Sequence, residues 1–282
     1  MGQNSNTSDL QSFIVRIVVD LNDEYEEKPF EREFTVELME QGLRSHYISG
    51  LIEVDVTKGR QLIKEYEERS GKEFSFTAWI TKCIAQAVNE HRNVHAIRKG
   101  KRLIIFKDVD VSVMIERQKD GEIGPYTYIV RKANEKTVKE IQDEIWGVRS
   151  HTDGKISDTA DQKSMQRLFA LPKFLRDFLL WRKFRTDPFF VKKHIGTVTV
   201  TAVGMFGKGK SGWAIPISIS PVYFALGGIA KKPAVVDENI EIRENLCVTI
   251  FINHDVVDGG PAARFVARFV ELVESVFGLD FQ

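Results

Sequence analysis

Alternating apolar and polar residues mark the strands that we expect in this chain. A weak alternation covers Phe13–Asp20, and strand patterns follow at Ile48–Val56, Leu103–Phe106, Val109–Glu116, Tyr126–Arg131, Thr197–Val203, Val222–Ile229, Ile240–Ile242 and Cys247–Ile252. In the pattern at Thr197–Val203, one face carries Thr197, Thr199 and Thr201, and the other carries Val198 and Val200. That strand should therefore present one polar and one apolar face.

Helical periodicity and capping residues predict four helices between these strands. They are expected at about Thr57–Arg69 before Gly71, at about Thr77–His91, after the capping box of Thr137 and Glu140, and near Pro261. Strands and helices do not follow a regular βαβ alternation, which favours the α+β class. We therefore predict one α+β domain over residues 35–282.

Two segments differ in composition from the rest. Residues 1–34 combine the weak first strand with an acidic run, which favours a solvated N-terminal segment. Residues 151–195 form a helical insertion rich in basic and aromatic residues, with seven Lys or Arg against two Asp between Lys173 and His194. Core-packed helices with a solvated basic edge are the simplest interpretation. A lid over a substrate tunnel, a surface for a phosphate-bearing ligand and a membrane-surface helix stay open.

Composition narrows the classes of function. The 40 basic and 40 acidic residues cancel, which disfavours binding to nucleic acid. Neither Cys83 nor Cys247 lies in a metal-ligand cluster, so we expect no metal site and a reducing compartment. The first residues do not have the pattern of a secretory leader, and no apolar stretch has the length of a membrane span. These features predict a cytoplasmic protein.

A phosphate-binding loop is one possible motif. Residues Gly204–Ser211 match the pattern G-x-x-x-x-G-K-[ST] and follow a predicted strand. Such a loop needs a helix directly after it, because the amides of that helix hold the phosphate. The next residues include Gly212 and Pro216 among alternating Ile and Ser, which are poor helix formers. A nucleotide-binding protein is therefore a disfavoured alternative.

His254 is the strongest candidate for chemistry. It follows a β-branched strand and stands four residues before Asp258, where a helix is expected to begin. One interpretation is a hydrogen-bonded strand-end histidine, with Asp258 as a carboxylate that the helix dipole favours. The other is a general base, because a strand end and a tight turn hold an imidazole rigidly. The neighbouring motifs have to decide between these interpretations.

Two stretches resemble motifs of one enzyme family. GTVTVTAVGMFG, residues 196–207, resembles the G-T-F-T-I-[ST]-N-x-G-x-x-G segment of the 2-oxoacid dehydrogenase acyltransferase (E2) catalytic domain. INHDVVDGGPAARF, residues 252–265, resembles its D-H-R-x-x-D-G-x-x-A-A-x-F segment. Weaker similarity begins at about residue 35. The His-x-x-x-Asp-Gly spacing is also similar to that of the wider chloramphenicol acetyltransferase superfamily.

The resemblance implies a fold, an activity and roles for three residues. The fold would be a two-layer mixed β-sheet with flanking helices, like that of chloramphenicol acetyltransferase. The activity would be acyl transfer between coenzyme A and a thiol such as dihydrolipoamide, or another nucleophile. His254 would be the general base and Thr201 the hydroxyl donor to the oxyanion. Asp258 would hold the histidine loop by pairing with an arginine, for which Arg44 is a candidate.

The resemblance also implies partners. These are an acyl-CoA, an acyl acceptor, other 2-oxoacid dehydrogenase components and further copies of the chain. The copies would form a homotrimer, or a higher multiple of trimers, with each active site at a subunit interface. The residues ahead of the domain are too few for lipoyl and subunit-binding domains, so we expect no covalent lipoyl group on this chain. The residues that contact coenzyme A stay unassigned.

One departure from the family pattern opens an alternative. Asp255 stands where relatives have Arg, directly after His254. A carboxylate against the imidazole favours the charged form of the ring, which cannot accept a proton. The insertion before Gly196 is also longer than the usual connection. A non-catalytic trimeric core that has lost the chemistry is therefore the alternative function.

Overall fold

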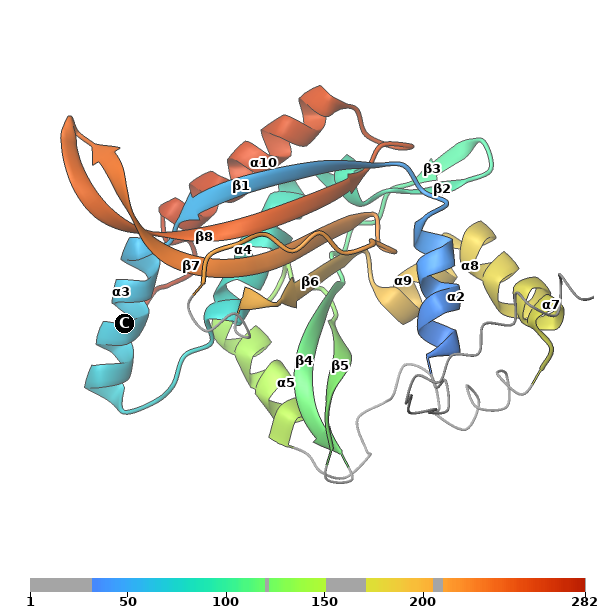
Figure 1. Ribbon diagram of the computed structural model, residues 1–282, viewed down its shortest axis with the longest axis horizontal. Helices are drawn as coiled ribbons and strands as arrows, with labels where there is room; N and C mark the ends of the chain where they lie inside the picture. The colour runs from blue at the N-terminus through green and yellow to red at the C-terminus, as the bar shows by residue number, and fades with distance from the viewer. Residues whose placement is uncertain (1–31, 120–121, 151–170, 205–209, 282) are drawn as a thin grey trace, which may run out of the picture. The chain divides into compact units, whose positions relative to one another are not determined.

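A six-stranded mixed β-sheet is the centre of the computed structural model, which describes residues 32–119, 122–150, 171–204 and 210–281 (Figure 1). Helices flank this sheet, so the predicted α+β class is confirmed. The strand expected at Phe13–Asp20 and the insertion before Leu171 lie outside the described residues. The domain boundary near residue 34 stays a prediction.

The strands follow the order β1-β8-β7-β6-β4-β5 across the sheet. β6 runs parallel to β4 and β7, and the other neighbours are antiparallel. The strands of this sheet are β1 (Tyr47–Asp55), β4 (Val111–Lys119), β5 (Glu122–Val130), β6 (Val198–Ala202), β7 (Val222–Val236) and β8 (Asn239–Asn253), and β2 (Ile97–Lys99) pairs with β3 (Arg102–Ile104) in a separate hairpin.

The described helices lie along one face of the sheet and beside one of its ends (Figure 1). They are α2 (Glu33–Gly42), α3 (Thr57–Ser70), α4 (Phe76–Glu90), the 3-10 turn η1 (Arg92–His95), α5 (Val138–Ser150), α7 (Lys173–Arg176), the π-helical turn η2 (Asp177–Trp181), α8 (Arg182–Thr186), α9 (Pro188–Ile195) and α10 (Gly259–Glu274).

The core lies between the sheet and the helices α4, α5 and α10. Alternate strand residues, including Val200, Phe224 and Ile250, turn their side chains into it. α4 begins where the Ser75 side chain accepts a hydrogen bond from the Ala78 amide, and Trp79 on this helix is fully buried. Burial of this apolar surface is the main favourable contribution to folding.

Local signals placed the four predicted helices, α3, α4, α5 and α10, correctly. α3 ends at Gly71, whose φ of 66° is the left-handed conformation that glycine adopts without strain. The predicted capping box precedes α5, because Thr137 N–H donates to Glu140 Oε2 at 2.7 Å and Glu140 N–H donates to Thr137 Oγ1 at 3.2 Å. α2 was not predicted, since its apolar side packs on residues distant in sequence, including Trp181.

The last strands are longer than the pattern predicted. β7 and β8 form one hairpin of 15 residues per strand in place of three separate strands. The hairpin turns at Asp237 and Glu238, which both have positive φ. Beyond a bulge between Leu226 and Ile229, its arm carries exposed apolar residues such as Ile240, which is 79% exposed. The first four residues of β8 are all exposed and no β7 residue opposite them is buried, so the apolar pattern of a buried strand is missing there and the sequence did not predict the pairing.

An extended segment, residues 210–221, covers part of the second face of the sheet. Trp213 Nε1 donates to the Ile52 carbonyl at 3.0 Å, and the Tyr47 hydroxyl donates to the Ser220 carbonyl at 3.1 Å. The segment passes so close to β7 that a Cβ on Gly228 would lie 1.9 Å from the Lys210 carbonyl oxygen. The two glycines of the β7 bulge therefore allow this close approach.

The conformation of the same segment tests whether the motif at Gly204–Ser211 can be a phosphate-binding loop. Residues 211–219 contain no helix, as expected from their sequence. The amides of a following helix are thus absent from the place where a phosphate would need them. Residues 205–209 of the motif lie outside the described residues. The residues that match the loop pattern are therefore not followed by the helix that a phosphate-binding loop requires.

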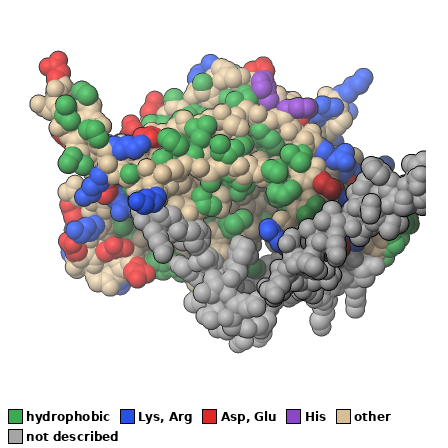
Figure 2. All heavy atoms as spheres, in the orientation of Figure 1, with side chains coloured by type: hydrophobic (Ala, Val, Ile, Leu, Met, Phe, Trp, Pro, Cys, Tyr) green, Lys and Arg blue, Asp and Glu red, His purple; other side chains and the backbone are tan. Residues whose placement is uncertain are grey.

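Apolar side chains stay exposed on this second face, which we call the open face. Figure 2 shows hydrophobic side chains spread over the surface that looks toward the viewer. They come from strands and from the extended segment, so they are not confined to one loop. The exposed ones are Leu51, Met114, Trp213, Ile215 and Ile217.

A buried histidine joins the start of β6 to a neighbouring loop. His95 is fully buried, with Nδ1 at 3.0 Å from Thr197 Oγ1 and Nε2 at 3.2 Å from the Phe106 carbonyl oxygen. Because a carbonyl only accepts, Nε2 carries the proton and Nδ1 accepts from the threonine hydroxyl. Burial lowers the pKa of His95 to about 4.

We predict that His95 destabilises the protein as pH falls from about 6.5 toward about 4. In this range the unfolded chain binds a proton on His95 and the folded chain does not, so the free energy of unfolding drops by up to about 3 kcal/mol. His95→Gln keeps a donor and an acceptor but does not titrate. Its urea midpoint should therefore fall less than that of the wild type between about pH 7 and about pH 4.5.

The matched control is His91→Gln, which removes a histidine at the end of α4. It should retain the pH dependence of the wild type, because the hydrogen bonds of His95 are untouched. An equal loss of stability in the wild type and His95→Gln would contradict the prediction.

Candidate active site

The end of β8 and the start of β1 hold the turn that carries His254. Tyr47 pairs with Asn253 in the register of these strands. The His254 amide donates to the His46 carbonyl at 2.7 Å, so β1 fixes the backbone just beyond β8. α10 begins directly after Asp258. The imidazole thus sits on a fixed strand end, with its side chain 50% exposed.

The carboxylate of Asp255 binds His46. Asp255 Oδ1 lies 2.8 Å from His46 Nδ1, and the Asp255 amide donates to Asn253 Oδ1 at 2.8 Å. Since an ionised carboxylate only accepts, Nδ1 of His46 carries the proton. Within the described residues, this arrangement engages Asp255 away from His254. Sequence reasoning missed His46, because 209 residues separate it from its partner.

Asp258 lies beside His254 and apart from its predicted arginine partner. Its Oδ1 is 3.9 Å from His254 Nδ1, which is too long for a hydrogen bond, and its side chain is 91% exposed. No ion pair joins it to Arg44 in the part of the chain that the structure describes. A hydrogen bond from Arg185, with Arg44 adding to it, holds the pKa of Asp177 below its usual range. The predicted pairing of Asp258 with Arg44 is therefore not seen within the described residues of one chain, and it stays a prediction.

Thr201 lies on the open face near the end of β6. It is buried, and its hydroxyl donates to Met114 Sδ at 3.6 Å. A thioether is a weak acceptor, so this contact leaves the hydroxyl proton available for a stronger one. Tyr223 lies next to it: burial raises the pKa of the Tyr223 phenol, and hydrogen bonding with Thr201 opposes this rise. The threonine hydroxyl can therefore donate to a charge that develops above this face.

Thr201 and His254 are far apart within one chain. Thr201 pairs with Ala225 on β7, and Ala225 pairs with Thr249 on β8. Asn253, the residue before His254, is four positions further along β8. At about 3.3 Å per residue and about 4.8 Å per strand, the backbones of Thr201 and Asn253 lie roughly 16 Å apart. The two side chains cannot act on the same atom inside one copy of the chain.

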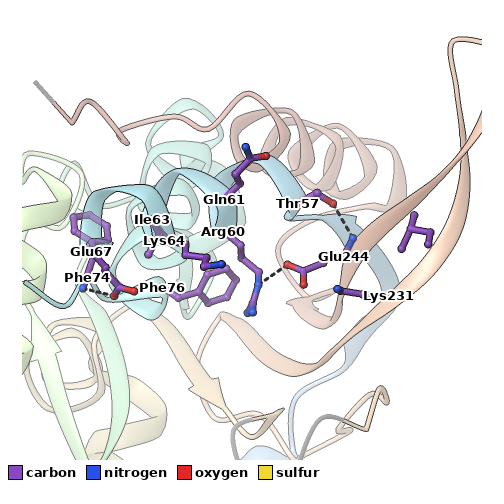
Figure 3. A pocket seen from close by; sticks show the side chains of 11 residues that line it. Thr57, Arg60, Gln61, Ile63, Lys64, Glu67, Phe74, Phe76, Lys231 and Glu244 are labelled. Atoms are coloured by element: carbon purple, nitrogen blue, oxygen red, sulfur yellow. Dashed lines mark hydrogen bonds and ion pairs between the residues drawn. The ribbon is translucent and has the colours of Figure 1, made fainter. Parts of the chain in front are cut away.

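A cavity of about 720 Å³ lies between α3 and the β7–β8 hairpin (Figure 3). Arg60 Nε lies 2.7 Å from Glu244 Oε2, and the Phe74 amide donates to Glu67 Oε1 at 2.8 Å. The contact between Arg60 on α3 and Glu244 on β8 crosses this cavity. We therefore assign the residues that line the cavity to holding the hairpin on α3. None of the predicted site residues lines it; the lining residues are Thr57, Arg60, Gln61, Ile63, Lys64, Glu67, Phe74, Phe76, Lys231, Ile242 and Glu244.

The described residues offer neither a metal site nor an activated cysteine. No group of three or more His, Cys, Asp and Glu side chains there is arranged to hold a metal ion. None of the described helices has the length and apolar character to cross a membrane. Burial raises the pKa of Cys83 and of Cys247, which disfavours the thiolate that a nucleophilic cysteine needs. His254 and Thr201 therefore stay the candidates.

Comparison with known families gives one match over most of the chain. Residues 25–164 and 192–279 match the family model described as 2-oxoacid dehydrogenases acyltransferase (catalytic domain). Thr201 and His254 both fall inside the matched ranges. Residues 165–191, which include α7, η2 and α8, fall outside them.

Curated proteins with similar sequences are larger than this chain. The lipoamide acyltransferase component of the branched-chain alpha-keto acid dehydrogenase complex of Bacillus subtilis is 28% identical over 232 residues, which are 80% of this chain and 46% of that protein. The dihydrolipoyllysine-residue acetyltransferase component of the pyruvate dehydrogenase complex of Corynebacterium glutamicum is 25% identical, over 82% of this chain and 30% of that protein. The chain spans about half the length of these relatives, or less.

Solved structures share the fold. A probable dihydrolipoamide acetyltransferase from Listeria monocytogenes has a TM-score of 0.64 at 20% identity, covering 90% of this chain and 96% of that one. The dihydrolipoamide acetyltransferase of Azotobacter vinelandii has a TM-score of 0.64 at 17% identity, covering 91% and 94%. The arrangement of strands and helices and the match to the family model agree. The chain belongs to the family of 2-oxoacid dehydrogenase acyltransferase catalytic domains.

Proposed function

We propose that this chain is an acyltransferase that moves an acyl group between coenzyme A and a thiol such as dihydrolipoamide. The observation that carries the proposal is the family match, which includes both the β6 segment and the turn after β8. Relatives are named as acyltransferase components of 2-oxoacid dehydrogenase complexes. Other components of such a complex are accordingly the partners that we propose, and the acceptor thiol comes from outside this domain. The predicted cytoplasmic location stays a prediction.

His254 is the general base in this proposal. Its amide is fixed by the His46 carbonyl, and its half-exposed ring is open to a substrate thiol. A neutral imidazole takes the proton of the attacking thiol as the sulfur forms a bond to the thioester carbonyl carbon. When the tetrahedral intermediate collapses, the bond to the other sulfur breaks and the imidazolium returns the proton to it. The exchange is balanced in either direction.

Thr201 is the donor to the oxyanion. As the carbonyl carbon becomes tetrahedral, its oxygen gains negative charge and needs a hydrogen-bond donor placed in advance. The Thr201 hydroxyl is buried beside the Tyr223 phenol, and its hydrogen bond to the Met114 thioether at 3.6 Å is weak, so little of that bond is lost when the hydroxyl turns to the oxygen. Thr201 is buried, and the low dielectric of a buried site strengthens such a hydrogen bond.

Two copies of the chain are needed to complete this site. Thr201 and His254 lie too far apart to serve one substrate within a chain. A cyclic assembly solves this, because the His254 turn of one copy can meet the open face of the next. The exposed apolar residues of the open face, including Trp213 and Ile215, support such a contact. We propose a homotrimer, or a multiple of trimers, with the active site at each interface.

The hydrogen bond between His46 and Asp255 supports an active enzyme over a non-catalytic core. A carboxylate against His254 would favour the charged ring and remove the base. Asp255, which stands in place of the family arginine, instead accepts from His46 at 2.8 Å. Its carboxylate is therefore engaged by His46 and not by the imidazole of His254. The replacement therefore does not by itself abolish the chemistry.

We predict that His254→Ala lowers turnover by about 10²- to 10⁴-fold, because the attacking thiol loses its base. The measurement is thiol release from acetyl-CoA and branched acyl-CoAs with dihydrolipoamide as acceptor. His91→Ala, on the helix side of the molecule, is the control and should keep the wild-type rate. Turnover that survives His254→Ala would overturn the assigned base. Binding of coenzyme A by the wild type without any turnover would favour the non-catalytic core.

We predict that Thr201→Ala and His254→Ala complement each other in mixed assemblies. Each variant alone should be nearly inactive, with the loss of the oxyanion donor costing about 10²- to 10³-fold. A cyclic assembly of randomly mixed subunits contains intact sites wherever a His254 of one copy meets a Thr201 of another. Co-expression should therefore restore roughly a quarter of the wild-type activity.

Separately folded variants, combined under conditions that prevent subunit exchange, are the control and should stay inactive. If co-expressed variants show no more activity than the separate ones, the site does not form between copies. Size-exclusion chromatography of each sample checks that the variants assemble like the wild type.

A further inference from the structure

The part of the chain outside the family match forms a helical surface of its own. Residues 165–191 are not covered by the family model, and their described part contains α7, η2 and α8. Arg176 and Arg182, which flank the π-helical turn, both have right-handed helical dihedral angles. Residues 173–186 therefore form one continuous helix that stands near α2 (Figure 1).

Buried polar contacts fix the inner side of this helix to α2. The Glu37 carboxylate accepts from Arg176 Nη2 at 2.6 Å and from Trp181 Nε1 at 2.6 Å. Burial raises the pKa of Glu37, but the hydrogen bonds from Arg176 and Trp181 outweigh it, and the pKa lies below its usual range. Phe34 stacks on Trp181 at 6.1 Å between ring centroids. The other side of the helix is therefore held in a defined orientation.

That other side exposes large apolar side chains. Phe174 is 71% exposed, Phe178 is 62% exposed and Leu179 is 52% exposed. Phe174 and Phe178 stand one turn apart, so they project from the same side of the helix. Apolar side chains that cluster on a fixed helix, rather than scatter singly, mark an interaction surface.

Two exposed cations lie over aromatic rings at this end of the helix, one of them over Phe178. The Arg182 guanidinium lies 5.5 Å from the Phe178 ring centroid, and Lys183 Nζ lies 5.0 Å from that of Phe190. In the part of the chain that the structure describes, neither Arg182 nor Lys183 forms an ion pair. Arg185 differs, because its guanidinium is paired with Asp177 at 3.0 Å. No carboxylate among the described residues therefore pairs with these two cations.

We propose that this outer face, made of Phe174, Phe178, Leu179, Arg182 and Lys183, binds the surface of an anionic phospholipid bilayer. The apolar side chains would enter the boundary between headgroups and acyl chains, and the two cations would contact lipid phosphates. An acidic protein would satisfy the cations but would need a matching groove for each ring. A bilayer can accommodate aromatic side chains in any arrangement. The exposed pair of aromatic residues therefore favours a lipid surface over an acidic protein as the partner. The proposal is independent of the acyl-transfer chemistry.

The test measures co-sedimentation of the full chain with vesicles. Binding is expected to vesicles of phosphatidylcholine and phosphatidylglycerol, not to phosphatidylcholine alone, and it should weaken as salt is raised. Phe174→Ser with Phe178→Ser, and Arg182→Glu with Lys183→Glu, should each lower the partition coefficient by about tenfold or more. Acyltransferase activity and thermal unfolding of the same variants show that the rest of the domain is intact.

Matched control variants lie on the β7–β8 arm. Ile240→Ser with Ile242→Ser removes side chains that are 79% and 73% exposed and should leave vesicle binding unchanged. The proposal is overturned if the wild type binds neutral and anionic vesicles equally, or if the outer-face variants bind like the wild type. Binding to polyglutamate without binding to any vesicle would also overturn it and would point to an acidic protein surface.

Discussion

The pairing of β8 with both β1 and β7 is the constraint on which the rest of the structure depends. One neighbour, β1, sets Tyr47 opposite Asn253 and so brings the His46 carbonyl to the His254 amide. The other, β7, ties β8 to the parallel centre of the sheet and to the strand that carries Thr201. A slip of one residue would reverse the faces of β8 and move His254 away from β1. The position of the base is therefore a property of the sheet register.

The sheet has two faces with different tasks. One face is sealed by α4, α5 and α10 and supplies the packed core. The open face keeps apolar side chains exposed and carries Thr201 beside Tyr223. Within one chain Thr201 does not reach His254. The contacts that stabilise a copy are therefore different from those that the proposed reaction needs. The core stabilises each copy, whereas the proposed reaction needs a second copy on the open face.

The helical insertion is joined to the rest of the domain by a buried carboxylate and by the packing of aromatic rings. A single buried carboxylate, Glu37, collects hydrogen bonds from Arg176 and Trp181. Charging these groups in a buried place is costly unless they stay paired, and their hydrogen bonds are directional, so the contact favours one orientation of the helix on α2. The insertion can therefore present a fixed outer face while the family fold beneath it keeps its strand order.

The sequence by itself determined the local structure and one half of the candidate site. Side-chain alternation located β1, β4 and β6, capping residues marked α5, and the His-x-x-x-Asp-Gly spacing pointed to His254, because these signals lie within a few residues of one another. Only the tertiary structure decided that Asp255 binds His46, that Asp258 does not meet Arg44 within one chain and that Thr201 lies far from His254. It also decided the long β7–β8 arm and the packing of α2 on the insertion. These features depend on strand register and on contacts between residues far apart in the chain, which a local pattern does not encode.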